Sequence, residues 1–158
     1  MYIPSNDSIN ITVTEIMDGF PSELRPFLLV EVCPLTRSFF SIIRALWEAA
    51  KIIQPTIRVL RQVNIIISVS PFGLNLLGGQ LLYTTKPEVI NACFNDLIFL
   101  DCNKMIHHPF EIQVTCILEE LVHTFYNVSD EKLTTQIVAL LLPAVEVKDG
   151  KYFVRDKD

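Results

Sequence analysis

Hydrophobic residues recur at helical spacing in three segments of the chain. Between Thr36 and Ile53, polar residues return every three or four positions and apolar residues occupy the rest. The polar positions of this segment are Ser41, Arg44, Glu48 and Lys51. The pattern predicts a mostly buried helix with one solvent-facing stripe, ended or kinked by Pro55.

The two other helical segments lie in the C-terminal half. One runs from about Pro109 to Tyr126, with the proline at its first position. After a break at 127–129, either Ser129 or Asp130 can cap another helix, which runs to Leu142 and stops at a proline. The predicted helix over 109–126 contains the most unusual polar residues of the chain.

Runs of alternating or β-branched residues predict the strands. They lie at 10–14, 63–69, 80–85 and 97–101. We expect 63–69 (VNIIISV) to be a central strand and 80–85 to be the edge strand of the sheet. In the tail, two alternating runs around Asp149-Gly150 predict a type I′ hairpin within 145–155. The prediction is a single α+β domain over 1–158, in which a small twisted sheet packs on the helices at 37–53 and 109–126.

Composition narrows the classes of function. The 158 residues include 13 basic and 18 acidic ones, for a net charge of −5, and we find no dense basic run. This argues against a nucleic-acid partner. The sequence has no apolar stretch long enough to span a membrane and no signal peptide, so we expect a cytoplasmic protein with four reduced cysteines. A hydrophobic fraction of 50% is compatible with a homo-oligomer or a partner-dependent subunit.

The sequence Glu119-Glu120-Leu-Val-His123 is the main chemical clue. On a helix, Glu119 and His123 project from one face a turn apart, and Glu120 borders that face. The neighbours of Glu119 on the helix surface are mostly apolar. A carboxylate in such surroundings is costly unless a metal ion or a histidinium compensates its charge.

This segment resembles the HExxH zinc helix of zincin metallopeptidases, with Glu119 in place of the first histidine. The longer stretch ILEELVHTFYNVSDEKLTTQIVALLLP is similar in layout to the small intracellular peptidases named for ImmA and IrrE. Both have an apolar lead-in, a short break, an acidic start to the next helix and an apolar end at Leu-Leu-x-Pro. The order of elements over about 36–143 also matches the minimal zincin layout.

The resemblance implies a metal-dependent peptidase acting on a peptide or protein. It assigns Glu119 as first metal ligand, Glu120 as general base, His123 as second ligand, and Asp130 or Glu131 as the third ligand. The ion would be zinc, bound more weakly than in HExxH, or another divalent metal such as manganese or iron. In zincin-like proteins an edge strand beside the cleft can align an extended peptide by β-addition; here we expect 80–85 to do so.

Other interpretations of the same residues remain open. Glu119 can be a surface residue or pair only with His123, and Asp130 and Glu131 can act only on the helix dipole. His107 and His108 can add a ligand, line the cleft or be solvated. A further alternative is a zincin scaffold without metal or catalysis, which acts as a protein-binding module.

Overall fold

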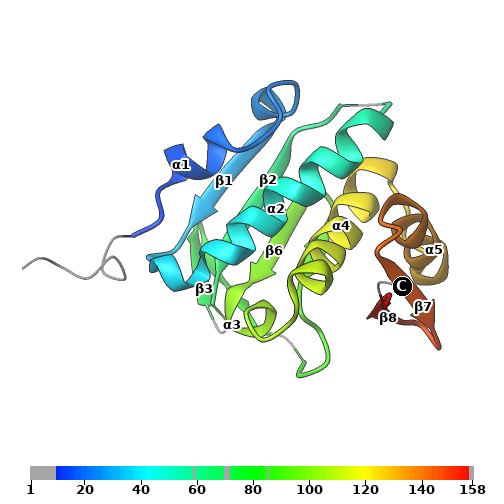
Figure 1. Ribbon diagram of the computed structural model, residues 1–158. Helices are drawn as coiled ribbons and strands as arrows, with labels where there is room; N and C mark the ends of the chain where they lie inside the picture. The colour runs from blue at the N-terminus through cyan, green and yellow to red at the C-terminus, as the bar shows by residue number, and fades with distance from the viewer. Residues whose placement is uncertain (1–9, 59, 70–71, 85, 157–158) are drawn as a thin grey trace, which may run out of the picture.

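The computed structural model describes residues 10–58, 60–69, 72–84 and 86–156, and its core is a four-stranded sheet (Figure 1). The strands are β1 (Leu28–Val32), β2 (Val63–Ser68), β5 (Ala92–Phe94) and β6 (Leu97–Asp101), in the order β1-β2-β6-β5. The first three in that order are parallel, and β5 runs antiparallel to β6 at one edge. This confirms the α+β class predicted from the sequence.

The long helices α2 (Phe40–Ile53) and α4 (Phe110–Tyr126) pack side by side across one face of the sheet (Figure 1). The predicted solvent stripe of α2 is confirmed at Arg44, Glu48 and Lys51, which are exposed, whereas Ser41 is half-buried. The apolar residues between them, such as Ile42 and Ile43, are buried. The first turn of the predicted helix, Arg37–Phe39, is a 3₁₀ turn. Pro55 lies in a second 3₁₀ turn, Gln54–Thr56, which follows the end of α2. Central strand β2 is buried along almost its whole length, as its β-branched residues predict.

The prediction of a strand at 10–14 is wrong. Thr12 instead caps a short helix, α1 (Val13–Asp18), by accepting a hydrogen bond from the backbone nitrogen of Glu15 at 3.2 Å. Ile11 and Ile16 are both buried in the core. The alternating pattern of 10–14 is thus compatible with a strand or with the start of a helix. The side-chain cap of Thr12 favours the helix.

Strand β1 was not predicted, because prolines surround it. Pro26 lies in a 3₁₀ turn (Arg25–Phe27) that leads directly into the strand. The burial of β1 alternates along Leu28–Val32, with Leu28 and Val30 buried and Leu29 exposed. The proline therefore marks the start of a strand, a position where no ladder hydrogen bond is lost.

The prediction that 80–85 forms the edge strand of the main sheet is also wrong. Among the residues that the structure describes, strand β4 (Gly79–Tyr83) pairs only with β3 (Phe72–Leu76), in a separate antiparallel hairpin. β3 was expected to be loop, and residue 85 lies outside the described residues. The edge of the main sheet beside α4 is β5, which the sequence analysis did not find.

The C-terminal elements follow the predicted order closely. After a short helix α3 (Cys102–Met105), α4 begins behind Pro109, and Asn127 ends it with a left-handed backbone (φ 53°). Next come α5 (Glu131–Leu141) and the hairpin β7–β8 (Val145–Lys148 and Lys151–Val154). Asp149 and Gly150 both have positive φ, as a type I′ turn requires. Both α5 and this hairpin pack against α4.

Candidate metal centre

Helix α4 places Glu119, Glu120 and His123 near its C-terminal end. The helix is buried on most of its surface, because it packs on α2, on the sheet and on α5. Glu120 is only 8% exposed, and the side chain of His123 is 11% exposed. Polar side chains at this depth need partners, so the contacts of each indicate what the site can bind.

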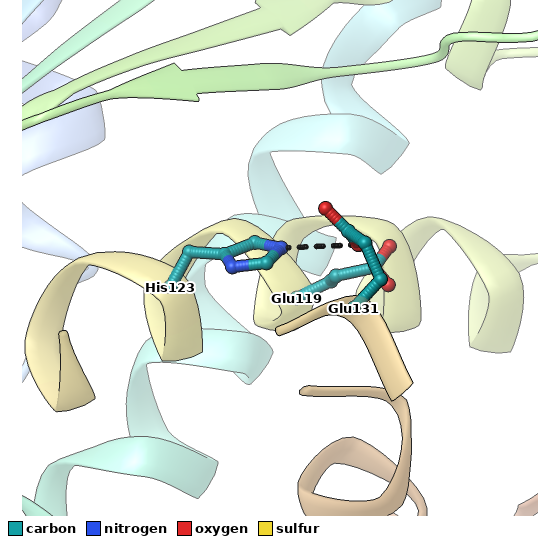
Figure 2. A group of neighbouring side chains, drawn as sticks. All are labelled: Glu119, His123 and Glu131. Atoms are coloured by element: carbon teal, nitrogen blue, oxygen red, sulfur yellow. Dashed lines mark ion pairs between the residues drawn. The ribbon is translucent and has the colours of Figure 1, made fainter. Parts of the chain in front are cut away.

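A tight turn brings the start of α5 next to this face of α4. The left-handed conformation of Asn127 reverses the chain, so that Glu131 lies beside His123 (Figure 2). The Nε2 atom of His123 is 3.5 Å from Oε2 of Glu131. One ligand atom from each of Glu119, His123 and Glu131 lies within 4.8 Å of the other two.

The imidazole of His123 is held in one orientation. Its Nδ1 lies 2.6 Å from the carbonyl oxygen of Val128. A carbonyl oxygen only accepts hydrogen bonds, so Nδ1 carries the hydrogen and the neutral ring keeps its lone pair on Nε2. Nε2 is therefore the atom available to a metal ion, and it is the atom that faces the carboxylates.

Glu119 has a hydrogen-bond donor outside α4. The phenol oxygen of Tyr152, on β8, donates to Oε1 of Glu119 at 3.0 Å. Burial raises the pKa of Glu119, the hydrogen bond from Tyr152 opposes this shift, and the charge of Glu131 adds to it. Burial and then the Glu119 carboxylate raise the pKa of Tyr152 in turn, so this phenol keeps its proton and remains a donor.

Glu120 is the most deeply buried of the three glutamates at this site. Burial raises its pKa to about 7, and the neighbouring Glu119 adds to the shift, whereas the Cys93 thiol opposes it. Burial, followed by the charges of nearby glutamates, raises the pKa of Cys93 and of Cys116 to about 12. Both thiols are therefore protonated at neutral pH and not poised as nucleophiles.

An open cleft of about 1090 Å³ runs over these residues. Its walls come from the segment 88–95 that includes β5, from α4, from the start of α5 and from the turn of the β7–β8 hairpin. Glu119, Glu120 and Glu131 line it, as do His123 and Tyr152. Phe94 on β5 also lines the cleft and is 72% exposed. A peptide-sized ligand can therefore reach the polar cluster from solvent.

The donor atoms of the cluster fit a divalent ion. Ligand bonds of about 2.0–2.2 Å keep tetrahedral ligand atoms about 3.3–3.6 Å apart, which matches the separation of His123 and Glu131. The three ligand atoms lie within 4.8 Å of one another, and a separation of 4.8 Å is wider than the roughly 3.6 Å that such an ion spans. The Glu131 side chain is 79% exposed and can close such a gap by rotating. One imidazole and two carboxylates suit zinc, and also harder ions such as manganese or iron.

The residues predicted from the sequence do not all converge. Glu119, His123 and Glu131 meet, and Glu120 lies beside them on the cleft wall. Asp130 does not join them, because its carboxylate caps α5 by accepting from the backbone nitrogen of Leu133 at 2.7 Å.

The two histidines before α4 differ in their positions. His107 is exposed, and neither histidine belongs to the cluster, but His108 lines the cleft.

The sequence analysis missed Tyr152, which lies 33 residues beyond Glu119. The only signal for it was the Asp149-Gly150 turn, which predicts the hairpin but not its contact with α4.

We compared the chain with known proteins to see whether this site belongs to a characterised family. No protein-family model, curated protein or solved structure matched it. Within the described residues, no helix has both the length and the apolar character needed to cross a bilayer.

Proposed function

We propose that this chain is a zincin-like, metal-dependent peptidase. The observation that carries the proposal is the convergence of Glu119, His123 and Glu131 at the wall of an open cleft, with Nε2 of His123 as the free ring nitrogen. A histidine and two carboxylates around one point form a ligand set for zinc or another divalent metal. Two of the three stand on one helix at the spacing of the HExxH ligands, with Glu119 at the first position.

Glu120 is suited to the role of general base. It lines the same cleft, one residue from Glu119 and three from His123, and so borders the metal cluster. A bound divalent ion supplies a water of lowered pKa and polarises the peptide carbonyl. The carboxylate of Glu120 would accept the proton of that water and pass it to the leaving amine.

The substrate in this proposal is an extended peptide. β5 forms the edge of the main sheet in the described chain, and its residues line the cleft. An edge strand presents backbone donors and acceptors to which a peptide can pair as an added strand. In this role β5 replaces 80–85, which the structure places outside the main sheet.

We further propose that the protein works in the cytoplasm. All four cysteines are unpaired thiols, which is the state that a reducing compartment maintains. Secretion of the natural protein with a Cys–Cys bond would contradict this placement.

A second function is supported by exposed apolar side chains on β5 and α5. Phe94 is 72% exposed, and Leu133 and Leu140 on α5 are 46% and 81% exposed. Exposed apolar residues of this size are common on protein-binding surfaces. The alternative is a non-catalytic module that binds a partner protein through this scaffold.

Metal content and peptide cleavage separate the two functions. The chain should be purified without chelator or affinity-tag metal, analysed for metals, and incubated with a peptide mixture whose products are read by mass spectrometry. We expect close to one divalent ion per chain and cleavage that Glu120→Gln abolishes while the metal remains, because Gln cannot accept a proton from water. Glu48→Gln, on the exposed stripe of α2, is the matched control. If the purified protein contains no metal and takes up no added zinc, the peptidase is excluded and the binding module remains.

A further inference from the structure

The two metal-site residues on α4 have hydrogen-bond partners of opposite kinds. His123 donates from Nδ1 to the carbonyl of Val128, and Glu119 accepts at Oε1 from the phenol of Tyr152. An imidazole that binds a metal has a second ring nitrogen with a hydrogen to donate. A carboxylate that binds a metal has a second oxygen that accepts. Each side chain thus has the partner that its own chemistry requires as a ligand.

Tyr152 reaches Glu119 because the C-terminal hairpin packs against α4. β8 contacts α4, and β7 contacts both α4 and α5. Within β8, Lys151, Phe153 and Val154 are exposed and only Tyr152 is half-buried. The hairpin therefore directs one side chain of this strand inward, and that side chain ends on Glu119.

The contact also determines how Glu119 can bind an ion. A carboxylate with no outer partner rotates about its last torsion, and it can bind a metal through either oxygen or both. The hydrogen bond from Tyr152 uses one lone pair of Oε1 and restrains the carboxylate's rotation, which favours binding of an ion through the second oxygen. Glu131 is 79% exposed at its side chain and is the more adjustable ligand. Glu119 and His123 then form the fixed part of the site.

We propose that the β7–β8 hairpin is part of the metal site and that Tyr152 is a positioning residue that holds Glu119 as a single-oxygen ligand. This inference rests on the proposed metal site and adds a residue to it that the HExxH-like string does not contain. Outer partners of metal ligands typically contribute about 10–100-fold to metal affinity. Tyr152 acts through Glu119 and is not assigned any contact with substrate.

The test compares two Tyr→Phe variants of the full chain. Tyr152→Phe removes the hydroxyl on Glu119. Tyr126→Phe is the matched control, because its hydroxyl donates to Thr56 at the C-terminal end of α4 and neither residue lines the cleft. Metal-free wild type and both variants are titrated with Zn²⁺ against a chromogenic chelator, and urea unfolding in chelator measures the stability of each protein.

We expect Tyr152→Phe to weaken zinc binding by about tenfold or more, and Tyr126→Phe to change it less than about twofold. A second readout is the visible absorption of bound Co²⁺, which responds to the number and geometry of its ligands. That spectrum should change in Tyr152→Phe and stay the same in Tyr126→Phe, even if both variants lose similar stability.

The outcomes distinguish the role of Tyr152 from the metal site itself. If wild type binds zinc and Tyr152→Phe binds it equally well, with the same cobalt spectrum, the positioning role is overturned and the metal site stands. If wild type binds neither ion, the metal site is overturned and the role of Tyr152 with it. Equal weakening in both Phe variants would mean a general effect of stability, and would also overturn the positioning role.

Discussion

His123 donates a hydrogen bond from Nδ1 to the carbonyl oxygen of Val128, at 2.6 Å, across the turn that joins α4 to α5. The turn is set by the left-handed backbone of Asn127, and the same turn brings Glu131 to within 3.5 Å of Nε2. One short connection thus fixes the orientation of the imidazole and the position of Glu131, the proposed third ligand. The break between the two helices is therefore part of the site.

The first prediction separates the two acids at the start of α5. Asp130→Ala removes the N-cap and should cost about 1 kcal/mol of unfolding free energy, with zinc affinity changed only a few-fold. Glu131→Gln should do the opposite. Its side chain is 79% exposed, so stability should change by less than about 0.5 kcal/mol, while loss of a ligand should lower zinc affinity by about tenfold or more. Urea unfolding in chelator and a zinc titration of each variant measure both effects. A larger loss of affinity in Asp130→Ala would mean that the third ligand is misassigned.

The second prediction concerns zinc-dependent stability. In wild type, zinc at about 100 times its dissociation constant should add about 2.7 kcal/mol to the unfolding free energy, because the ion binds only the folded chain. Glu119→Ala should show no such gain. In chelator, this variant should differ from wild type by no more than about 1 kcal/mol, because losing the hydrogen bond from Tyr152 offsets the removal of a partly buried charge.

Thermal or urea unfolding with and without zinc checks this second prediction. Glu48→Ala, at an exposed position of α2, is the control and should gain as much from zinc as wild type. An undiminished zinc effect in Glu119→Ala would show that Glu119 is not a ligand.

The third prediction concerns the pH dependence of the metal-free protein. The pKa of Glu120 is raised from 4.5 to about 7 in the folded state, so the folded chain binds more protons than the unfolded chain between these values. The contribution of Glu120 to stability is fully present below about pH 4.5 and is lost as pH rises through 7. The loss should be on the order of 3 kcal/mol. Glu119, whose pKa is also raised, acts in the same direction.

Urea unfolding of the metal-free protein from pH 5 to pH 8 measures this dependence. Glu120→Gln cannot titrate, so its stability should fall much less than that of wild type over the same range. The difference between the two profiles gives the contribution of Glu120 together with its coupling to Glu119. Parallel profiles would mean that the carboxyl of Glu120 is not desolvated as the structure indicates.

The helices of the site were predictable because their signals are local. Helix α4 has helical periodicity over its own residues, Pro109 marks its start, and the polar break at 127–129 marks its end. The spacing of Glu119 and His123 then follows from helix geometry alone. The choice between Asp130 and Glu131 was not local in this sense. Ser129 and Asp130 were both possible N-caps, and it is the capping by Asp130 that leaves Glu131 to face α4.

The strands and the outer partners of the site were not predictable in the same way. β5 has only three residues and is defined by its pairing with β6, which no local pattern reveals. β1 was hidden by the proline just before it. Tyr152 was visible only as one residue of a predicted hairpin. Its contact with Glu119 depends on how that hairpin packs on α4, and this is decided by tertiary structure.

The last prediction tests directly whether Glu119 is the first ligand, as proposed. Glu119→His restores the usual HExxH string, and imidazole is a better zinc ligand than a single carboxylate oxygen. The structure offers the new ring a partner, because the phenol of Tyr152 can accept a hydrogen bond as well as donate one. We therefore expect both proteins to bind zinc, with the variant tighter by about tenfold or more. Calorimetric titration of the two metal-free proteins measures this.

The three other results of that titration have distinct meanings. If neither protein binds zinc, the proposal of a metallopeptidase is contradicted and the non-catalytic binding module is favoured. Binding in the variant alone would indicate an enzyme that lost its metal through the substitution at 119, since the surrounding groups would still support ligation. Binding in wild type alone would show that the site is built around a carboxylate. In that case the hydrogen bond from Tyr152 to Glu119 would be the feature that the imidazole cannot reproduce.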